Sequence, residues 1–197
     1  MPVRERSFGR VCAVFAAFSV VTVTACRAPQ DRGATASDLT FTTTATIEDI
    51  MRSIIDPAAD AVWDAVVTTV TPNGTESIAP ESSEDWAQLR RHAITLVEAT
   101  NLLLVEGRQV AAPGSRSDMP GVDLEPEEIA ALIAEDRDRW VRLVTELHRT
   151  GVTILDAVER QDVDALLVAG DRLDLACENC HARYWYPGFA GRPDATP

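Results

Sequence analysis

Positive charge is scarce in this sequence, and lysine is absent from it. The 18 basic side chains are all arginines and stand against 31 acidic residues, which gives a formal net charge of −13. A protein that binds nucleic acid or an anionic lipid surface needs a basic patch, so this acidic balance argues against both. A basic or neutral partner fits better, and we expect no nucleic-acid function.

Cysteine and histidine are also few, with four cysteines and three histidines in 197 residues. Cys12 lies within an apolar N-terminal run and Cys26 follows it, so the even number of cysteines does not indicate a disulfide framework. A structural zinc site needs a second cluster of cysteine or histidine at ligand spacing, and the sequence offers none. One stretch remains to be explained, Cys177-Glu178-Asn179-Cys180-His181.

This stretch has the spacing of a c-type haem attachment site. On a helix, positions i, i+3 and i+4 share one face, so both thiols can form thioethers to the haem vinyl groups while His181 binds the iron. The alternatives are a thioredoxin-like redox pair, a structural disulfide and half of a zinc site. Redox pairs usually open a helix within a βαβ unit, and no strand-rich pattern precedes Cys177. We therefore predict one covalent haem c, attached to Cys177 and Cys180, with His181 as the proximal iron ligand.

The first 25 residues have the features of a secretory signal, with three arginines followed by an apolar run from Val11 to Ala25. The run is shorter than the roughly 20 apolar residues of a transmembrane helix. Its end, Val23-Thr24-Ala25-Cys26, resembles the bacterial lipobox, which implies lipidation of Cys26. An ordinary cleaved signal and an uncleaved anchor are the alternatives. Each version exports the protein, and we predict a periplasmic protein anchored to a bacterial membrane through Cys26.

The rest of the chain divides into a tether, one domain and a tail. Residues 26–45 are rich in Thr, Ala and Ser without apolar periodicity, which predicts a flexible tether. From 46 to 186, apolar residues recur at helical spacing and no run alternates with period two, so we predict an all-α domain of four helices. The tail, 187–197, is expected to be loose.

Capping and turn residues predict the limits of these helices. The expected extents are residues 46–71, beginning with a Thr46–Asp49 capping box and ending at a turn, 82–107, 126–160, and 161 onwards into Cys177. Pro57 interrupts the first helix, and we expect a kink there rather than two separate helices. The third helix is unusually long, so a break near residues 136–138 is an alternative.

A haem motif near the end of a fourth helix resembles the cytochrome c′ family, the four-helix-bundle c-type cytochromes. Ordinary cytochromes c carry the motif near the N-terminus, so the late position of Cys177 discriminates between the two. The resemblance covers residues 46–186 and implies an antiparallel four-helix bundle with the haem near the end of the last helix. Tyr184 matches an aromatic position of the family and is expected to pack on the haem. Trp185 departs from the basic residue that usually follows.

The resemblance also implies a choice on the distal side of the iron. In one branch of the family an apolar side chain of the first helix leaves five-coordinate iron that binds NO or CO. In the other a methionine of that helix ligates the iron of an electron carrier. Met51 lies in the second turn of the first predicted helix, whereas Met119 lies in a loop. Most methionines on apolar faces fill gaps in the core, but we favour Met51 as the distal ligand.

The other histidines and the tryptophans are weaker candidates. His92 lies at the rim of an apolar helix face and can approach the haem, although a partly buried, hydrogen-bonded histidine is the commoner role. His148 is expected to face solvent. Trp63, Trp86 and Trp140 have the spacing of core residues.

These observations predict a single-electron carrier with His181 and Met51 as axial ligands, which exchanges electrons with a redox partner protein. A five-coordinate haem protein that binds NO or CO is the alternative. A haem enzyme needs a histidine or a carboxylate over the iron, and the sequence indicates none, so we expect no enzymatic activity. The resemblance also leaves open that two copies pair as a homodimer.

Overall fold

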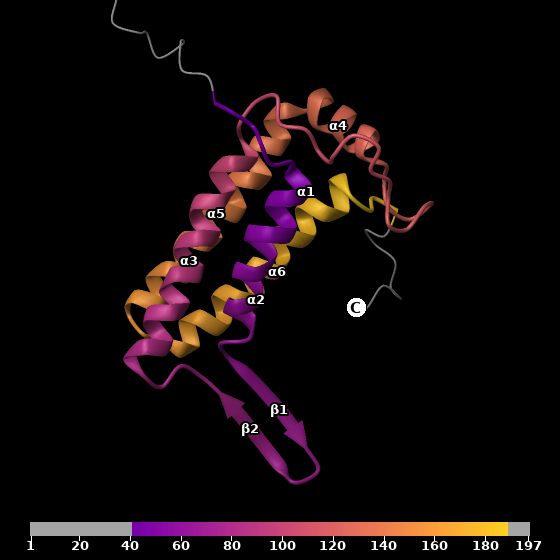
Figure 1. The fold of residues 1–197 in the computed structure, drawn as a ribbon. Helices are drawn as coiled ribbons and strands as arrows, with labels where there is room; N and C mark the ends of the chain where they lie inside the picture. The colour runs from indigo at the N-terminus through magenta and orange to yellow at the C-terminus, as the bar shows by residue number, and fades with distance from the viewer. Residues whose placement is uncertain (1–40, 189–197) are drawn as a thin grey trace, which may run out of the picture. The chain divides into compact units, whose positions relative to one another are not determined.

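Helices dominate the part of the chain that the structure, a computed structural model, describes: residues 41–188 (Figure 1). The expected signal segment 1–25, Cys26, the tether up to residue 40 and the tail from residue 189 lie outside the described residues. None of the described helices is long and apolar enough to cross a membrane.

The elements follow one another as α1 (Ile47–Ile50), the π-helical turn η2 (Met51–Ile55), α2 (Asp56–Trp63), β1 (Val67–Thr71), β2 (Gly74–Ile78), α3 (Ser83–Leu103), α4 (Pro126–Glu135), α5 (Arg137–Glu159) and α6 (Val163–Tyr184). A long loop joins α3 to α4.

Short-range capping determines where the helices begin. Thr46 Oγ1 accepts a hydrogen bond from the backbone N–H of Asp49 at 3.0 Å, and Asp49 Oδ2 accepts one from the N–H of Thr46 at 2.9 Å. Ser82 and Asp85 repeat this capping box before α3. Asp162 caps α6 through the N–H of Ala165. The predicted starts of the first, second and fourth helices are thus confirmed.

Pro57 lies inside a helical segment that continues without a gap from Ile47 to Trp63. A proline has no N–H and its ring clashes with the carbonyl four residues earlier, so it disrupts the regular α-helical turn that precedes it. The chain widens the preceding turn into η2, where the N–H of Asp56 donates to the carbonyl of Met51. A π-turn therefore stands at the position where we expected a kink.

The core lies where α5 packs against both α3 and α6, and α2 also contacts those two helices. Leu96, Ile154 and Leu173, one from each of α3, α5 and α6, have no exposed surface. Gly151 allows the close approach of α5 to α3, because a Cβ at this position would lie 3.0 Å from Val97 Cγ2. The helix pairing therefore depends on a small residue as well as on aliphatic burial.

The expected all-α, antiparallel four-helix bundle is wrong. Residues 67–78 form a two-stranded antiparallel hairpin in which Val67 pairs with Ile78 and Thr71 with Gly74. The predicted turn at Pro72-Asn73 is present, but it joins two strands rather than ending a helix. The β-branched run before it and the Asn-Gly dipeptide favour a hairpin. Because both strands are mostly exposed, no alternation of apolar and polar residues marked them in the sequence.

The third predicted helix is also divided, as the alternative allowed. Asp136 leaves helical geometry, with φ −135° and ψ 70°, and separates α4 from α5. Its side chain accepts a hydrogen bond from the N–H of Arg139 and so caps α5. The region 126–160 therefore contributes two helices to the fold instead of one.

The start of α1 is held by the chain that follows α3. The N–H of Ile47 donates to the carbonyl of Gln109 at 2.9 Å. The guanidinium of Arg108 donates to the carbonyl of Ala45 and to that of Leu102, near the end of α3. These bonds place η2 beside the C-terminal end of α3, which is where the cavity described below lies.

We predict that Gly151→Ala destabilises the protein through Val97. Alanine favours a helix over glycine by up to about 1 kcal/mol, whereas overpacking a close contact costs about 1–3 kcal/mol, so a net loss is expected. In a Val97→Ala background the clash is removed, and Gly151→Ala should become neutral or stabilising. Urea unfolding of the four variants measures this coupling. An equal effect of Gly151→Ala in both backgrounds would contradict the close contact.

A second prediction concerns acid. Hydrogen bonds from the backbone of Thr46, Ser82 and Ala165 lower the pKa values of Asp49, Asp85 and Asp162, respectively. The stability that these carboxylates contribute is therefore present above the ordinary aspartate pKa of about 4 and is lost as the pH falls through their lower folded pKa values.

The matched variant carries Asp49→Asn, Asp85→Asn and Asp162→Asn, which keep an accepting oxygen but cannot titrate. Its free energy of unfolding should fall less on acidification than that of the unaltered protein, measured by urea unfolding at a series of pH values. If the free energy of unfolding fell equally with pH in both proteins, the three capping carboxylates would not contribute to the pH dependence of stability.

Candidate functional site

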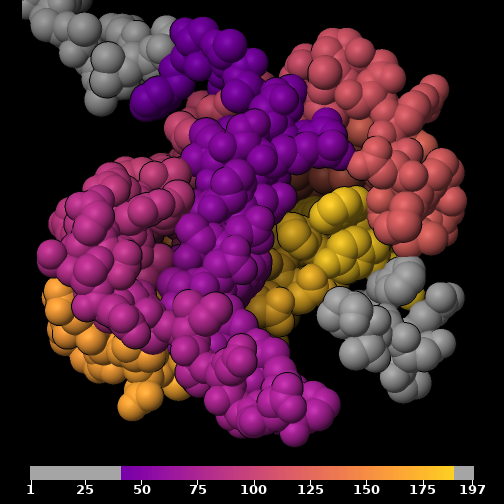
Figure 2. All heavy atoms as spheres, turned by 60° about the horizontal axis from the view of Figure 1, so that its bottom comes forward, coloured from indigo at the N-terminus to yellow at the C-terminus, as the bar shows by residue number. Residues whose placement is uncertain are grey.

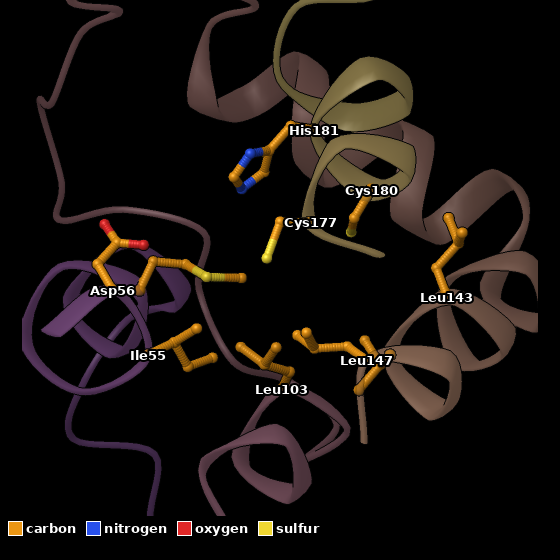
Figure 3. Close-up of a pocket in the computed structure, with 10 residues that line it drawn as sticks. Ile55, Asp56, Leu103, Leu143, Leu147, Cys177, Cys180 and His181 are labelled. Carbon is orange, nitrogen blue, oxygen red and sulfur yellow. The ribbon is translucent and has the colours of Figure 1, made fainter. Parts of the chain in front are cut away.

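The last turns of α6 present Cys177, Cys180 and His181 on one helix face. All three side chains line a single cavity (Figure 3). The two cysteines are free thiols, and each of the three residues is half-buried. The structure thus brings together the three residues that the sequence motif singled out.

The other walls of this cavity come from three separate parts of the chain and are mostly apolar. The lining residues are Met51 and Ile55 of η2, Asp56 of α2, Leu103 of α3, and Leu143, Val144 and Leu147 of α5. Figure 3 shows leucines of α3 and α5 facing the space that the two thiols enter. A group bound here would therefore meet a largely hydrocarbon surface.

Burial controls the protonation of the two thiols. It raises the pKa of Cys180 to about 12. Burial is also the main cause that raises the pKa of Cys177 to about 12, with smaller contributions from Cys180 and nearby carboxylates. Both sulfurs are consequently S–H groups at neutral pH, and nothing activates either as a thiolate nucleophile of the kind that a redox catalyst needs.

His181 is held as a neutral ring. Burial lowers its pKa, although the charges of Glu178 and Asp56 act in the opposite direction. Its imidazole makes edge contacts with the rings of Trp185 and Tyr186, at centroid distances of 5.1 and 5.9 Å. The hydroxyl of Tyr186 in turn donates to Glu178 Oε1 at 2.6 Å. A neutral, positioned imidazole is the form that binds a metal.

Sequence reasoning missed Asp56 as a site residue. Partial burial raises the pKa of its carboxyl, while the charges of His181 and Arg52 act to lower it. Asp56 follows Met51 by five residues, a spacing that does not share a face on an α-helix. Both residues line the cavity because η2 is wider than an α-helical turn. A proline at the next position was the one available signal.

The donor set fits a c-type haem, since two thiols at i and i+3, a neutral imidazole and apolar walls meet at one place. The space is small: the cavity volume is about 20 Å³, whereas pockets for small molecules and cofactors hold about 300–1,000 Å³. A porphyrin therefore fits only if a wall moves outward. In the wall formed by η2 and the start of α2, Met51 is half-buried and Asp56 is exposed, whereas Ile55 is 2% exposed and anchors the same segment in the core. In Figure 2 the C-terminal part of α6 is visible beside this first helical segment.

Tyr184 is not among the residues that line the cavity. It lies one turn beyond His181, is 3% exposed, and packs edge-on against Trp140 with ring centroids 5.2 Å apart. Trp86 is buried like Trp140, whereas Trp63 is more exposed and its Nε1 donates to the carbonyl of Gly170. In the structure, therefore, the aromatic position next to the motif belongs to the core.

The remaining histidines lie away from the cavity. His92 is half-buried on α3 and does not line it. His148, which we expected to face solvent, is half-buried, and its Nδ1 lies 2.9 Å from Thr100 Oγ1 and 3.2 Å from the carbonyl of Val97. It links α5 to α3 by hydrogen bonding, so the expectation of a solvent-facing side chain is wrong.

Within residues 41–188, no group of three or more His, Cys, Asp or Glu side chains could hold a bare metal ion. No protein-family model, no curated protein and no solved structure matches the chain. The functional interpretation therefore rests on the chemistry of this cavity.

Proposed function

We propose that the protein is an exported c-type cytochrome that transfers single electrons and binds one haem covalently through Cys177 and Cys180. The observation that carries this proposal is that both thiols and the imidazole of His181 line one apolar cavity. Each thiol adds across a vinyl group: sulfur forms a bond to one carbon, hydrogen goes to the other, and nothing is released. The bound haem supplies an iron that takes up and releases one electron.

The residues of the chain bind and shield that group. Cys177 and Cys180 attach it, and His181 ligates the iron through a neutral ring. Leu103 and Leu147 exclude water from the cavity, and a dry site reduces the solvent rearrangement that accompanies a change of charge. The thiols fit this task because they are protonated and not paired in a disulfide.

Whether Met51 ligates the iron distinguishes two candidate functions. Among the described residues that line the cavity it carries the only thioether, and it comes from a different element than His181. As a second axial ligand it raises the reduction potential, as is typical of an electron carrier. The aliphatic lining, including Ile55 and Leu103, favours a second candidate, a five-coordinate haem protein that binds NO or CO, in which Met51 only fills space.

The proposal includes a redox partner protein and a membrane anchor. A net charge of −13 favours a redox partner with a basic docking surface. Lipidation of Cys26 would hold the protein at a bacterial membrane on the exported side, where c-type haem is attached. Pairing of two copies as a homodimer is compatible with this arrangement.

We predict that the purified protein carries haem that acid acetone does not extract. Cys177→Ser combined with Cys180→Ser removes both thioethers, so any haem that this variant retains should be fully extractable. The measurement is the haem absorbance of the two phases after extraction, with the unaltered protein as the control. Covalent haem in the double variant would refute the attachment site.

We predict a low-spin absorption spectrum in both redox states that becomes high-spin in Met51→Ala. The matched control is Met119→Ala, because Met119 is 53% exposed in the loop between α3 and α4 and does not line the cavity. This control should leave the spectrum unchanged. A high-spin ferrous protein that binds CO readily without any substitution would rule out ligation by Met51 and favour the second function.

A further inference from the structure

Asp56 is the only carboxylate among the described residues that line the cavity. Figure 3 shows Asp56 and His181 at one end of the lining, with Leu143 and Leu147 at the other. The two side chains are close enough to interact electrostatically. The cavity therefore has a polar end and an apolar end, and the polar end holds a group that can carry a negative charge.

The backbone around Asp56 has an unusual geometry that brings this residue to the cavity wall. The N–H of Asp56 donates to the carbonyl of Met51 and closes the π-turn, and the ring of Pro57 restricts the chain directly after it. π-turns are rare and often occur at functional sites. Here the turn presents two different side chains, a thioether and a carboxylate, to the same cavity. An α-helical turn could not place both, because residues five apart do not share a face.

Asp56 is exposed on its outer side, where water screens its charge. On the cavity side the lining is mostly aliphatic, and a charge acts more strongly across such a lining than across water. Arg52 is the cation that acts on Asp56, and it also pairs with Asp118 at 2.6 Å and with Glu48 at 3.1 Å, with 60% of its side chain exposed. A cation that is shared and hydrated in this way neutralises Asp56 only in part.

We propose that Asp56 tunes the reduction potential of the bound haem, because its negative charge at the cavity wall stabilises the oxidised state of the iron. This inference rests on the proposed function. Net charge and hydrogen bonding near an iron centre are general determinants of its potential. Asp56 thus acts on the iron through its charge and does not ligate it.

The test is a redox titration of the haem-loaded protein, followed by visible absorption. Asp56→Asn removes the charge and keeps the shape, so at a fixed applied potential the ratio of oxidised to reduced protein should fall about tenfold, a rise in midpoint of about 59 mV for a one-electron couple. Asp56→Glu retains the charge and should stay close to the unaltered protein. Asp56→Ser, also neutral, replaces Asp56→Asn if that variant does not fold.

The matched control is Asp60→Asn. Asp60 lies one turn further along α2, is exposed, and does not line the cavity, so the same loss of net charge should leave the midpoint nearly unchanged. Equal shifts in Asp56→Asn and Asp60→Asn would overturn the proposal, because they would reflect net charge alone. An unchanged midpoint in Asp56→Asn, with an unaltered spectrum, would also overturn it.

A separate measurement distinguishes failure of the proposed function from failure of this inference. Haem staining of the denatured, unaltered protein shows whether covalent haem is present before any potential is measured. An absence of stained haem overturns both proposals. Stained haem with no effect specific to Asp56 overturns only this one. A shift specific to Asp56 with an unchanged spectrum supports it, since the axial ligands have then stayed the same.

Discussion

The fold of the site depends on one constraint, a proline placed inside the first helical segment. Pro57 cannot donate the hydrogen bond that an α-helix requires of it, and the segment stays continuous only because η2 is wider than an ordinary turn. That widening turns Met51 and Asp56 towards the same cavity. Without it, Ile54 rather than Ile55 would follow Ile50 at helical spacing, and a different set of side chains would face α6.

Burial against the aliphatic walls has two chemical consequences at the end of α6. It keeps Cys177 and Cys180 protonated, and it keeps the His181 imidazole neutral. Each consequence suits covalent attachment of a cofactor better than it suits thiol redox catalysis, which needs a stabilised thiolate. The environment therefore favours the proposed covalent attachment over the other functions that the Cys-x-x-Cys spacing alone leaves open.

The features predicted correctly from the sequence are local ones. The capping box at Thr46 and the convergence of Cys177 with His181 depend on residues three or four positions apart, and such spacings have a fixed geometry on a helix. The hairpin at 67–78 was missed because neither strand has a buried apolar face, so its residues do not alternate between apolar and polar. The place of Asp56 in the cavity wall was missed because it depends on a π-turn, which changes the spacing on which helical reasoning relies.

The balance at His181 shows which physical effect controls the site. Two carboxylates, Glu178 and Asp56, act to raise its pKa, yet burial outweighs them and the net shift is downward. A site dominated by charge would hold a proton on this imidazole and lose the lone pair that a metal needs. A site dominated by burial keeps that lone pair free and leaves the carboxylates to act over a longer range. Of these two carboxylates, Asp56 also lines the cavity, so its charge is placed to act on a group that His181 binds.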